Sequence, residues 1–330
     1  MANEVPAVPF DPRLDLIRDA IPADKPDWTE NIAWSFFDPQ ADVALYGHLG
    51  RMQPDRRIWE GLSLIFLPNG QFFANRSLGV NLSAARNAEY DYRPVIPGKL
   101  WRYEFNGTAQ RVDPAELRRR PLTDAPFEVA SYDLTFEALQ PVFNMHRSTL
   151  ASDRMHLEHA GRVHGSVVIG GQRFEIDATG YRDHSMSQRT FTTLDSETWA
   201  NCAFPSGRIF SILEVRRGER QILEGQVFID GVTHHAKPLD VPALEDSAGA
   251  PHIGKLRIAS DAGENVIAWG TLEGRSMAFQ LLRPVGMRPG LDWSRTDNVA
   301  AIQCPAEFTW NGEVGYGWLE RTRPLHSLRD

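Results

Sequence analysis

The fold is decided by the stretch at residues 162–189, which reads RVHGSVVIGGQRFEIDATGYRDHSMSQR. Its first part predicts a β-hairpin from Arg162 to Thr179 that turns at Gly170-Gly171, because glycine accepts the positive φ angles of a tight turn. Its second part, Gly180 to Arg189, gathers an acid, an imidazole, two arginines and two serines in ten residues. We expect these charged side chains at the mouth of a β-structure.

The rest of the chain repeats this hairpin pattern. Alternating apolar and polar residues flank four further turn dipeptides, namely Asn69-Gly70, Asn106-Gly107, Asp230-Gly231 and Asn311-Gly312. Such dipeptides are the strongest short-range signals for a hairpin. Short helices are predicted only from Asp11 to about Ala20 and from Asp113 to the arginines at 118–120, where an aspartate followed by proline can begin a helix. The chain is therefore predicted to be nearly all β, in antiparallel sandwiches or barrels.

The length of 330 residues favours about two domains. No low-complexity linker separates two halves of the sequence, and hairpin signals occur in both. We place the boundary just after the charged run, which gives an N-terminal β domain at residues 1–194 and a C-terminal one at residues 195–330. The expected fold class is thus two tandem antiparallel β domains with few short helices.

The composition excludes several classes of protein. A net charge of −8 disfavours nucleic acid and anionic membranes as partners, since both select basic surfaces. No apolar run is long enough to predict a membrane span. Residues Met1 to Phe10 lack the basic start and apolar centre of a signal peptide, and Cys202 and Cys304 do not make a disulfide framework. These features predict a cytoplasmic protein with reduced thiols.

Cofactor motifs are missing from the sequence. There is no glycine-rich dinucleotide fingerprint, phosphate-binding loop or nucleophile elbow, so we expect no nucleotide cofactor. The run His156-Leu-Glu-His159 differs from the zinc signature, which has different spacing and needs a helix, so we expect no metal. Aromatic residues make up 10% of the chain. They fill β cores, line a large apolar ligand cavity, or do both.

Asp183 and His184 form the first candidate site. Neighbouring residues of a strand point to opposite faces, so both side chains cannot enter one cavity from a regular strand. A carboxylate near an imidazole raises the imidazole pKa toward neutrality, which suits proton transfer. The alternative is a structural ion-pair cluster in which Asp183 holds Arg182 or Arg189.

Two further strands carry ionisable groups. His156 and Glu158 share one strand face and could act as acid and base, although a polar exposed face has the same pattern. In the last strand, Tyr316, Trp318 and Glu320 share a face. Glu320 is either a buried functional carboxylate or an acid that locks two strands or two domains together.

The charged run resembles a family signature. It is similar to the Gly-x-x-Asp-His-(Ser/Asn)-Trp-Gly motif of the superfamily of hydroxyneurosporene synthase (carotenoid 1,2-hydratase) and AttH-like, lipocalin-like proteins, in its uncharacterised bacterial branch. Met186 stands in place of the motif's tryptophan. The resemblance covers most of the chain through four other landmarks, at Trp28–Glu30, Leu67–Gly70, His156–Gly161 and Gly312–Glu320.

The resemblance implies two tandem lipocalin-like β domains with an apolar pocket at or near their interface. Characterised members of the superfamily protonate an alkene and add water, or fold a polyene for cyclisation, without a redox cofactor. In the carotenoid hydratases, a tyrosine and an aspartate also follow about one strand after the motif. Phe210 and Ile212 occupy that region here.

These observations lead to two functional hypotheses. The first is a cofactor-independent hydratase or dehydratase, isomerase or cyclase that applies acid–base chemistry to a hydrophobic terpenoid, steroid or polyketide-like molecule. The second is a non-catalytic carrier of a hydrophobic ligand. The oligomeric state is left open, with a homodimer as one candidate. The expected catalytic residues are His184, Asp183, Glu158 and Glu320, and the expected substrate-binding residues are His156, Tyr181, Met186, Tyr316, Trp318, Trp199 and Phe210.

Overall fold

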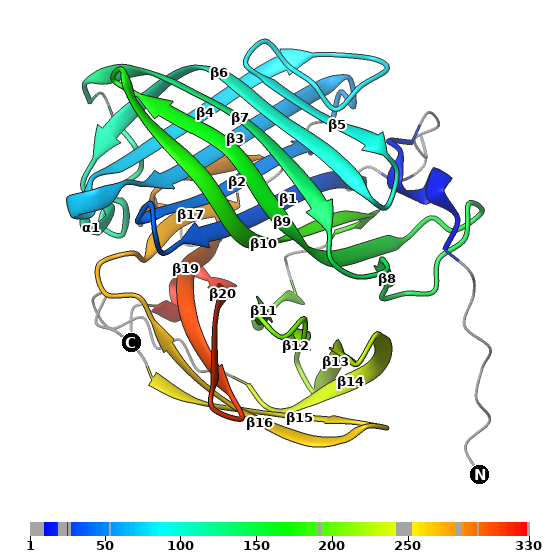
Figure 1. Ribbon diagram of the computed structural model, residues 1–330. Helices are drawn as coiled ribbons and strands as arrows, with labels where there is room; N and C mark the ends of the chain where they lie inside the picture. The colour runs from blue at the N-terminus through cyan, green and yellow to red at the C-terminus, as the bar shows by residue number, and fades with distance from the viewer. Residues whose placement is uncertain are drawn as a thin grey trace.

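Two β-barrels, one lying against the other, make up the protein (Figure 1). The computed structural model describes residues 10–18, 25, 28–52, 54–123, 125–189, 193–241, 253–281, 286–295 and 297–328. The prediction of a nearly all-β chain is confirmed, because antiparallel strands account for most of these residues.

The first barrel closes through eight strands in the order β10-β1-β2-β3-β4-β6-β7-β9, with β9 paired to β10. Strand β5 adds to β6, and β8 adds to β9, outside this ring. The ten strands are β1 (Trp28–Asp38), β2 (Val43–Arg51), β3 (Ile58–Phe66), β4 (Phe72–Val80), β5 (Tyr90–Ile96), β6 (Leu100–Val112), β7 (Phe127–Ala138), β8 (Phe143–Asn144), β9 (Met155–Ile169) and β10 (Gln172–Gln188).

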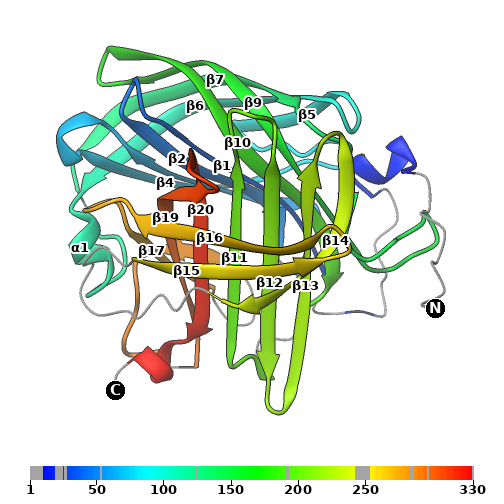
Figure 2. The ribbon, with the colours of Figure 1, turned by 60° about the horizontal axis from the view of Figure 1, so that its bottom comes forward.

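The second sheet also returns on itself, in the order β16-β15-β14-β13-β12-β11-β20-β19, with β16 paired to β19. In Figure 2, β15 and β16 cross the direction of β11, β12 and β20 at a steep angle. Strands β17 and β18 extend the sheet beyond β19. The strands are β11 (Ser196–Ala203), β12 (Ile209–Arg217), β13 (Arg220–Ile229), β14 (Val232–Asp240), β15 (Ile253–Ser260), β16 (Gly263–Thr271), β17 (Met277–Leu281), β18 (Met287–Pro289), β19 (Val299–Trp310) and β20 (Glu313–Pro324).

Helical segments in the described chain are short. The aspartate caps are as predicted, because Asp11 and Asp113 each accept a hydrogen bond from a backbone N–H in the first turn. The helix expected from Asp11 is a single 3-10 turn, and its predicted end near Ala20 lies outside the described residues. The segments are η1 (Pro12–Asp15), η2 (Pro68–Gly70), α1 (Pro114–Leu117) and η4 (Leu325–Leu328).

Most of the predicted hairpin turns are confirmed. Asn69, Asp230, Asn311 and Gly170 have positive φ angles of 64°, 51°, 52° and 58°, and each lies between paired strands. The turn predicted at Asn106-Gly107 is wrong, because these residues continue β6 and pair with Ser131 and Ala130 of β7. Neither Asn106 nor Gly107 has a positive φ angle.

The three largest apolar cores of the described residues lie inside the first barrel, inside the second barrel and between the two. The interior of the first barrel is rich in aromatic residues, and Trp34 stacks on Tyr103 with ring centroids 4.4 Å apart. The second barrel has its own interior around Phe210 and Phe308. A third core lies between the barrels, where Tyr46 of β2 packs against Phe279 and Trp318 of the second sheet.

Polar contacts also join the two sheets. The Arg275 guanidinium binds Asp42 and lies 5.5 Å from the ring centroid of Phe37. The backbone N–H of Met287 donates to the buried carboxylate of Glu60 at 3.0 Å. The first sheet ends at residue 188 and the second begins at residue 196, while the division into domains 1–194 and 195–330 stays a prediction.

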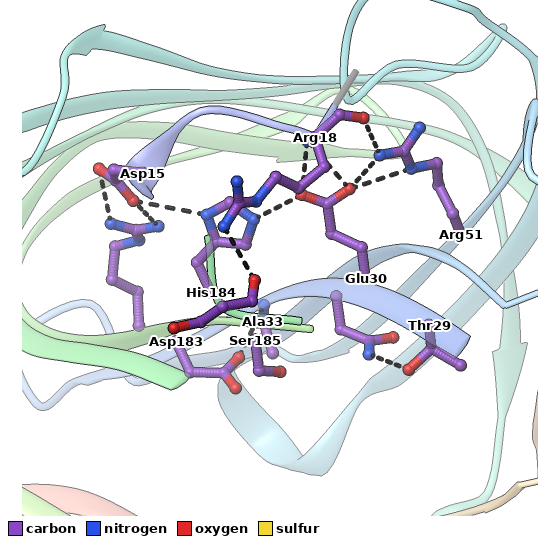
Figure 3. A network of polar contacts seen from close by, with 12 residues as sticks. Asp15, Arg18, Thr29, Glu30, Ala33, Arg51, Asp183, His184 and Ser185 are labelled. Carbon is purple, nitrogen blue, oxygen red and sulfur yellow. Dashed lines mark hydrogen bonds and ion pairs between the residues drawn. The ribbon is translucent and has the colours of Figure 1, made fainter. Parts of the chain in front are cut away.

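A buried ionic network fastens η1 to the first barrel (Figure 3). The Asp15 carboxylate accepts hydrogen bonds from Arg182 Nη2 at 2.9 Å, from Trp101 Nε1 at 2.7 Å and from the backbone N–H of Gly98 at 2.7 Å. The Arg182 guanidinium also lies 4.0 Å from the ring centroid of Trp101. Asp15 and Arg182 have no exposed side-chain surface, so water does not screen their attraction.

His184 lies inside this network. Its Nδ1 is 3.6 Å from Asp15 Oδ1, and its Nε2 is 3.0 Å from Glu30 Oε1, whose carboxylate also pairs with Arg51. Burial disfavours the charged imidazole, but the hydrogen bond to Glu30 and the nearby carboxylate of Asp15 outweigh burial and raise the His184 pKa. The two carboxylates therefore favour the charged form of the ring.

We predict that Asp15→Asn destabilises the protein by about 3–5 kcal/mol, because it leaves the buried Arg182 without its counter-charge. Urea unfolding followed by circular dichroism measures the change. The matched control is Asp133→Asn, which breaks an exposed ion pair with Arg102 and should cost about 0–1 kcal/mol. Equal, small losses for the two variants would contradict a stabilising role for the network.

Candidate functional site

A pocket that is open to solvent lies between the two barrels. One part of its wall is apolar and includes Tyr46, Met52, Trp199, Leu213, Phe279 and Met287. The other part is polar and includes His48, His156, Asp183, Arg189, Glu197 and Glu320. An apolar wall with a few polar groups, at a junction between two folded units, is typical of small-molecule sites.

Strand β10 divides its charged run between two environments. Asp183 lines the pocket, whereas His184 points the opposite way into the buried network. This arrangement follows from the alternation of side chains along a strand. His184, one of the expected catalytic residues, is therefore not among the residues that line this pocket, whereas Asp183 is.

His156 and Asp183 form an ion pair on the pocket wall. The Nε2 atom of His156 lies 3.1 Å from Asp183 Oδ2 and 3.2 Å from Glu158 Oε1. Burial opposes the charged ring, but the attraction of the two nearby carboxylates outweighs it and raises the pKa of His156 to about 10. His156 is consequently a cation at neutral pH, and it holds the pKa of Asp183 below its ordinary value despite burial.

Glu158 lies behind this pair and joins the two barrels. Its buried carboxylate accepts hydrogen bonds from Tyr181 Oη at 3.0 Å, from Trp199 Nε1 at 2.9 Å and from the Ser211 hydroxyl. Tyr181 in turn accepts a hydrogen bond from Gln226 Nε2 at 2.9 Å. Because these donors come from β10, β11, β12 and β13, Glu158 positions the wall of the pocket from behind.

Glu320 provides a carboxyl group on the second barrel's side of the pocket. It accepts hydrogen bonds from Gln303 Nε2 and, at 2.8 Å, from Thr322 Oγ1. Burial, and after it the nearby carboxylate of Glu197, raise the pKa of Glu320 to about 7. Burial also raises the pKa of Glu197. A large share of Glu320 is therefore protonated at neutral pH, unlike an ordinary glutamate.

The other expected binding residues are spread over several environments. Trp199 lines the main pocket, while Tyr181, Tyr316 and Trp318 line a small neighbouring cavity.

Two of the expected binding residues, Met186 and Phe210, do not line the pocket. Met186 shares the face of His184 and packs with Leu14, Trp28 and Leu157, away from the pocket. Phe210 faces the interior of the second barrel. Both side chains fill cores.

Sequence reasoning missed several pocket residues, among them the ionisable His48 and Glu197. His48 lies in the buried strand β2, and the sequence pattern there predicts that a single histidine belongs to the core. Glu197 precedes Trp199 by two positions, so strand alternation places both on one face and could have identified it.

Neither a metal site nor a membrane-spanning helix occurs in the described part of the chain. In these residues, no group of three or more His, Cys, Asp or Glu side chains could hold a metal ion. None of the helices in the described ranges has the length and apolar character needed to cross a bilayer.

Comparisons with known proteins identify relatives by family and by fold. The model of a family described as "Domain of unknown function (DUF7064)" matches residues 14–325. Among curated proteins, none matches the sequence. A provisionally named AttH protein from Nitrosomonas europaea has a similar structure, with a TM-score of 0.60, 11% identity, and coverage of 97% of this chain and 99% of that one.

Two other solved structures share the fold. Kievitone hydratase from Nectria haematococca gives a TM-score of 0.53 at 9% identity, covering 89% of this chain and 88% of its own. CghA in complex with Sch210972 gives 0.54 at 11% identity, covering 90% and 88%. At such low identities these similarities establish the two-barrel, lipocalin-like fold, as the sequence resemblance implied.

We predict that the raised pKa of Glu320 makes stability depend on pH. The folded protein keeps this proton up to about pH 7, whereas an unperturbed glutamate releases it near 4.5. The contribution to stability is therefore complete below pH 4.5 and is lost as the pH rises toward 7.

Melting temperatures measured from pH 5 to 8 should fall more steeply for the unaltered protein than for Glu320→Gln. Glu264→Gln, at an exposed ion pair with Arg257, is the control and should follow the unaltered protein. Parallel curves for all three proteins would show that the pKa of Glu320 is ordinary.

Proposed function

The chain belongs to the DUF7064 family, and we propose that its inter-barrel pocket is the active site of a hydratase-like enzyme acting on a hydrophobic small molecule. The reaction is hydration, dehydration, isomerisation or cyclisation by acid–base chemistry, without a redox cofactor. The observation behind the proposal is that the carboxyl group of Glu320, with its pKa of about 7, faces a pocket that combines an apolar wall with a polar one.

Glu320 is suited to the role of general acid. An acid works best when its pKa lies close to the working pH, since it then both holds a proton and releases it readily. In a hydration, Glu320 protonates one carbon of an alkene, and water attacks the other carbon. The attacking water then loses its proton to the carboxylate that Glu320 has become, which restores the acid.

The pocket walls support a cationic intermediate. Trp199 and Phe279 offer aromatic faces, which attract positive charge within about 6 Å. The ionised carboxylate of Asp183 lies on the same wall and is held in place by the backbone N–H of Ala33 at 3.1 Å. The apolar residues keep bulk water away from the intermediate.

The other expected catalytic residues receive supporting roles in this proposal. His156 holds its proton too tightly to give it up at neutral pH, so we assign it to positioning Asp183. Glu158 positions His156 and Trp199. His184 is assigned to the stability of the first barrel, because its ring contacts Asp15 and Glu30 on the other face of β10.

The fold comparison agrees with this proposal without deciding it, since one protein of the same fold is named a hydratase. We propose terpenoid, steroid or polyketide-like molecules as the substrate class, because one wall of the pocket, which includes Trp199, Phe279 and Met287, is apolar. The cytoplasmic location and the homodimer stay predictions.

The decisive experiment uses isotopic water. Terpenoid alkenes, unsaturated steroids and polyene polyketides are incubated with the protein in ¹⁸O-labelled water and in deuterium oxide, and the products are analysed by mass spectrometry. We expect heavy oxygen or deuterium to enter at least one compound. Glu320→Gln should lower that rate by about 10²-fold or more, as expected for loss of a general acid.

Glu264→Gln, far from the pocket on an exposed face of β16, should keep full activity and serves as the matched control. An unaltered rate in Glu320→Gln would remove Glu320 from the mechanism. If compounds bind but all are recovered unchanged and unlabelled, the carrier hypothesis replaces the enzyme.

A further inference from the structure

His48 is a buried histidine of the pocket with a fixed neighbour on one side of its ring. Its Nε2 lies 3.2 Å from Asn31 Oδ1, and the Asn31 amide nitrogen donates to Thr29 Oγ1 at 3.0 Å. An amide oxygen can only accept a hydrogen bond, so with this amide orientation the imidazole proton resides on Nε2. The other ring nitrogen, Nδ1, is then an acceptor.

The Nδ1 atom of His48 has no hydrogen-bond partner among the described residues, although it is buried. A buried acceptor without a partner is unfavourable, because it has lost its hydrogen bonds to water. Burial also lowers the pKa of His48 to about 4, so the ring stays uncharged at neutral pH. The pocket therefore holds a neutral acceptor that lacks a donor.

The charges around His48 are already balanced. The His156 cation lies between the carboxylates of Asp183 and Glu158. The Arg189 guanidinium donates to Ser185 Oγ at 2.7 Å. Burial raises the pKa of Glu197, and the charge of Arg189 partly opposes that rise. A ligand with a full charge would disturb these pairs, so the pocket suits an uncharged ligand.

We infer that His48 Nδ1 accepts a hydrogen bond from a hydroxyl group of the substrate, so that the pocket selects uncharged alcohols and phenols carried on an apolar frame. The inference rests on the proposed function only in taking the inter-barrel pocket as the ligand site. His48 is a specificity-determining residue in this account, and Asn31 is the residue that fixes its tautomer.

Binding of three matched probes tests this inference. Isothermal titration calorimetry compares 4-phenylphenol with its methyl ether, 4-methoxybiphenyl, and with biphenyl-4-carboxylate. We expect the phenol to bind about tenfold more tightly than the ether, the effect of one hydrogen bond to an otherwise unpaired acceptor. The carboxylate should bind more weakly than the phenol.

The variant His48→Phe keeps a flat ring but removes the acceptor, so it should bind phenol and ether within about twofold of each other. The matched control is His164→Phe, at an exposed position of β9, which should keep the tenfold preference. Circular dichroism establishes that both variants are folded.

Nitrogen NMR of the unaltered protein gives a second test that needs no variant. With ¹⁵N-labelled histidine at pH 7, His48 should have its proton on Nε2, and the Nδ1 resonance should shift with 4-phenylphenol but not with the ether. A proton on Nδ1, equal affinities for phenol and ether, or no binding of either would overturn the inference. Since these experiments measure binding alone, their outcome is independent of whether the protein catalyses water addition.

Discussion

The buried carboxylate of Glu158 is the constraint on which the arrangement of the two barrels depends. It has no exposed surface, and it receives hydrogen bonds from Tyr181, Trp199 and Ser211 as well as the charge of His156. A buried ion is tolerable only when such partners surround it. These partners belong to both barrels. The hydrogen bonds to Glu158 therefore determine how the barrels pack together and where the pocket forms.

Strand β10 shows how one sequence serves stability and a site together. Arg182 and His184 face the interior of the first barrel and bind Asp15, whereas Asp183 faces the pocket. Carboxylates raise the pKa of His184 in the barrel interior and of His156 at the pocket, while burial lowers the pKa of His48, which has no ion pair with a carboxylate among the described residues.

Local rules predicted the elements and part of the site. Alternation correctly separated Asp183 from His184 and joined His156 to Glu158, because it depends only on strand geometry. It could not tell which face would meet the second barrel, and His184 was expected to be catalytic because it matches the histidine of the family motif. The same limit applies to His48, whose environment depends on Asn31 and Asp183 from other strands. At Asn106-Gly107, pairing with β7 overrode the local preference for a turn.

We expect the space between the barrels, and not the interior of either barrel, to hold the ligand. A crystal structure with 4'-bromobiphenyl-4-ol tests it directly, because bromine is located by its anomalous scattering. We predict that the bromine atom lies among Trp199, Leu213 and Phe279, with the hydroxyl group near His48. Bromine beside His184 inside the first barrel, or only on the outer surface, would contradict it.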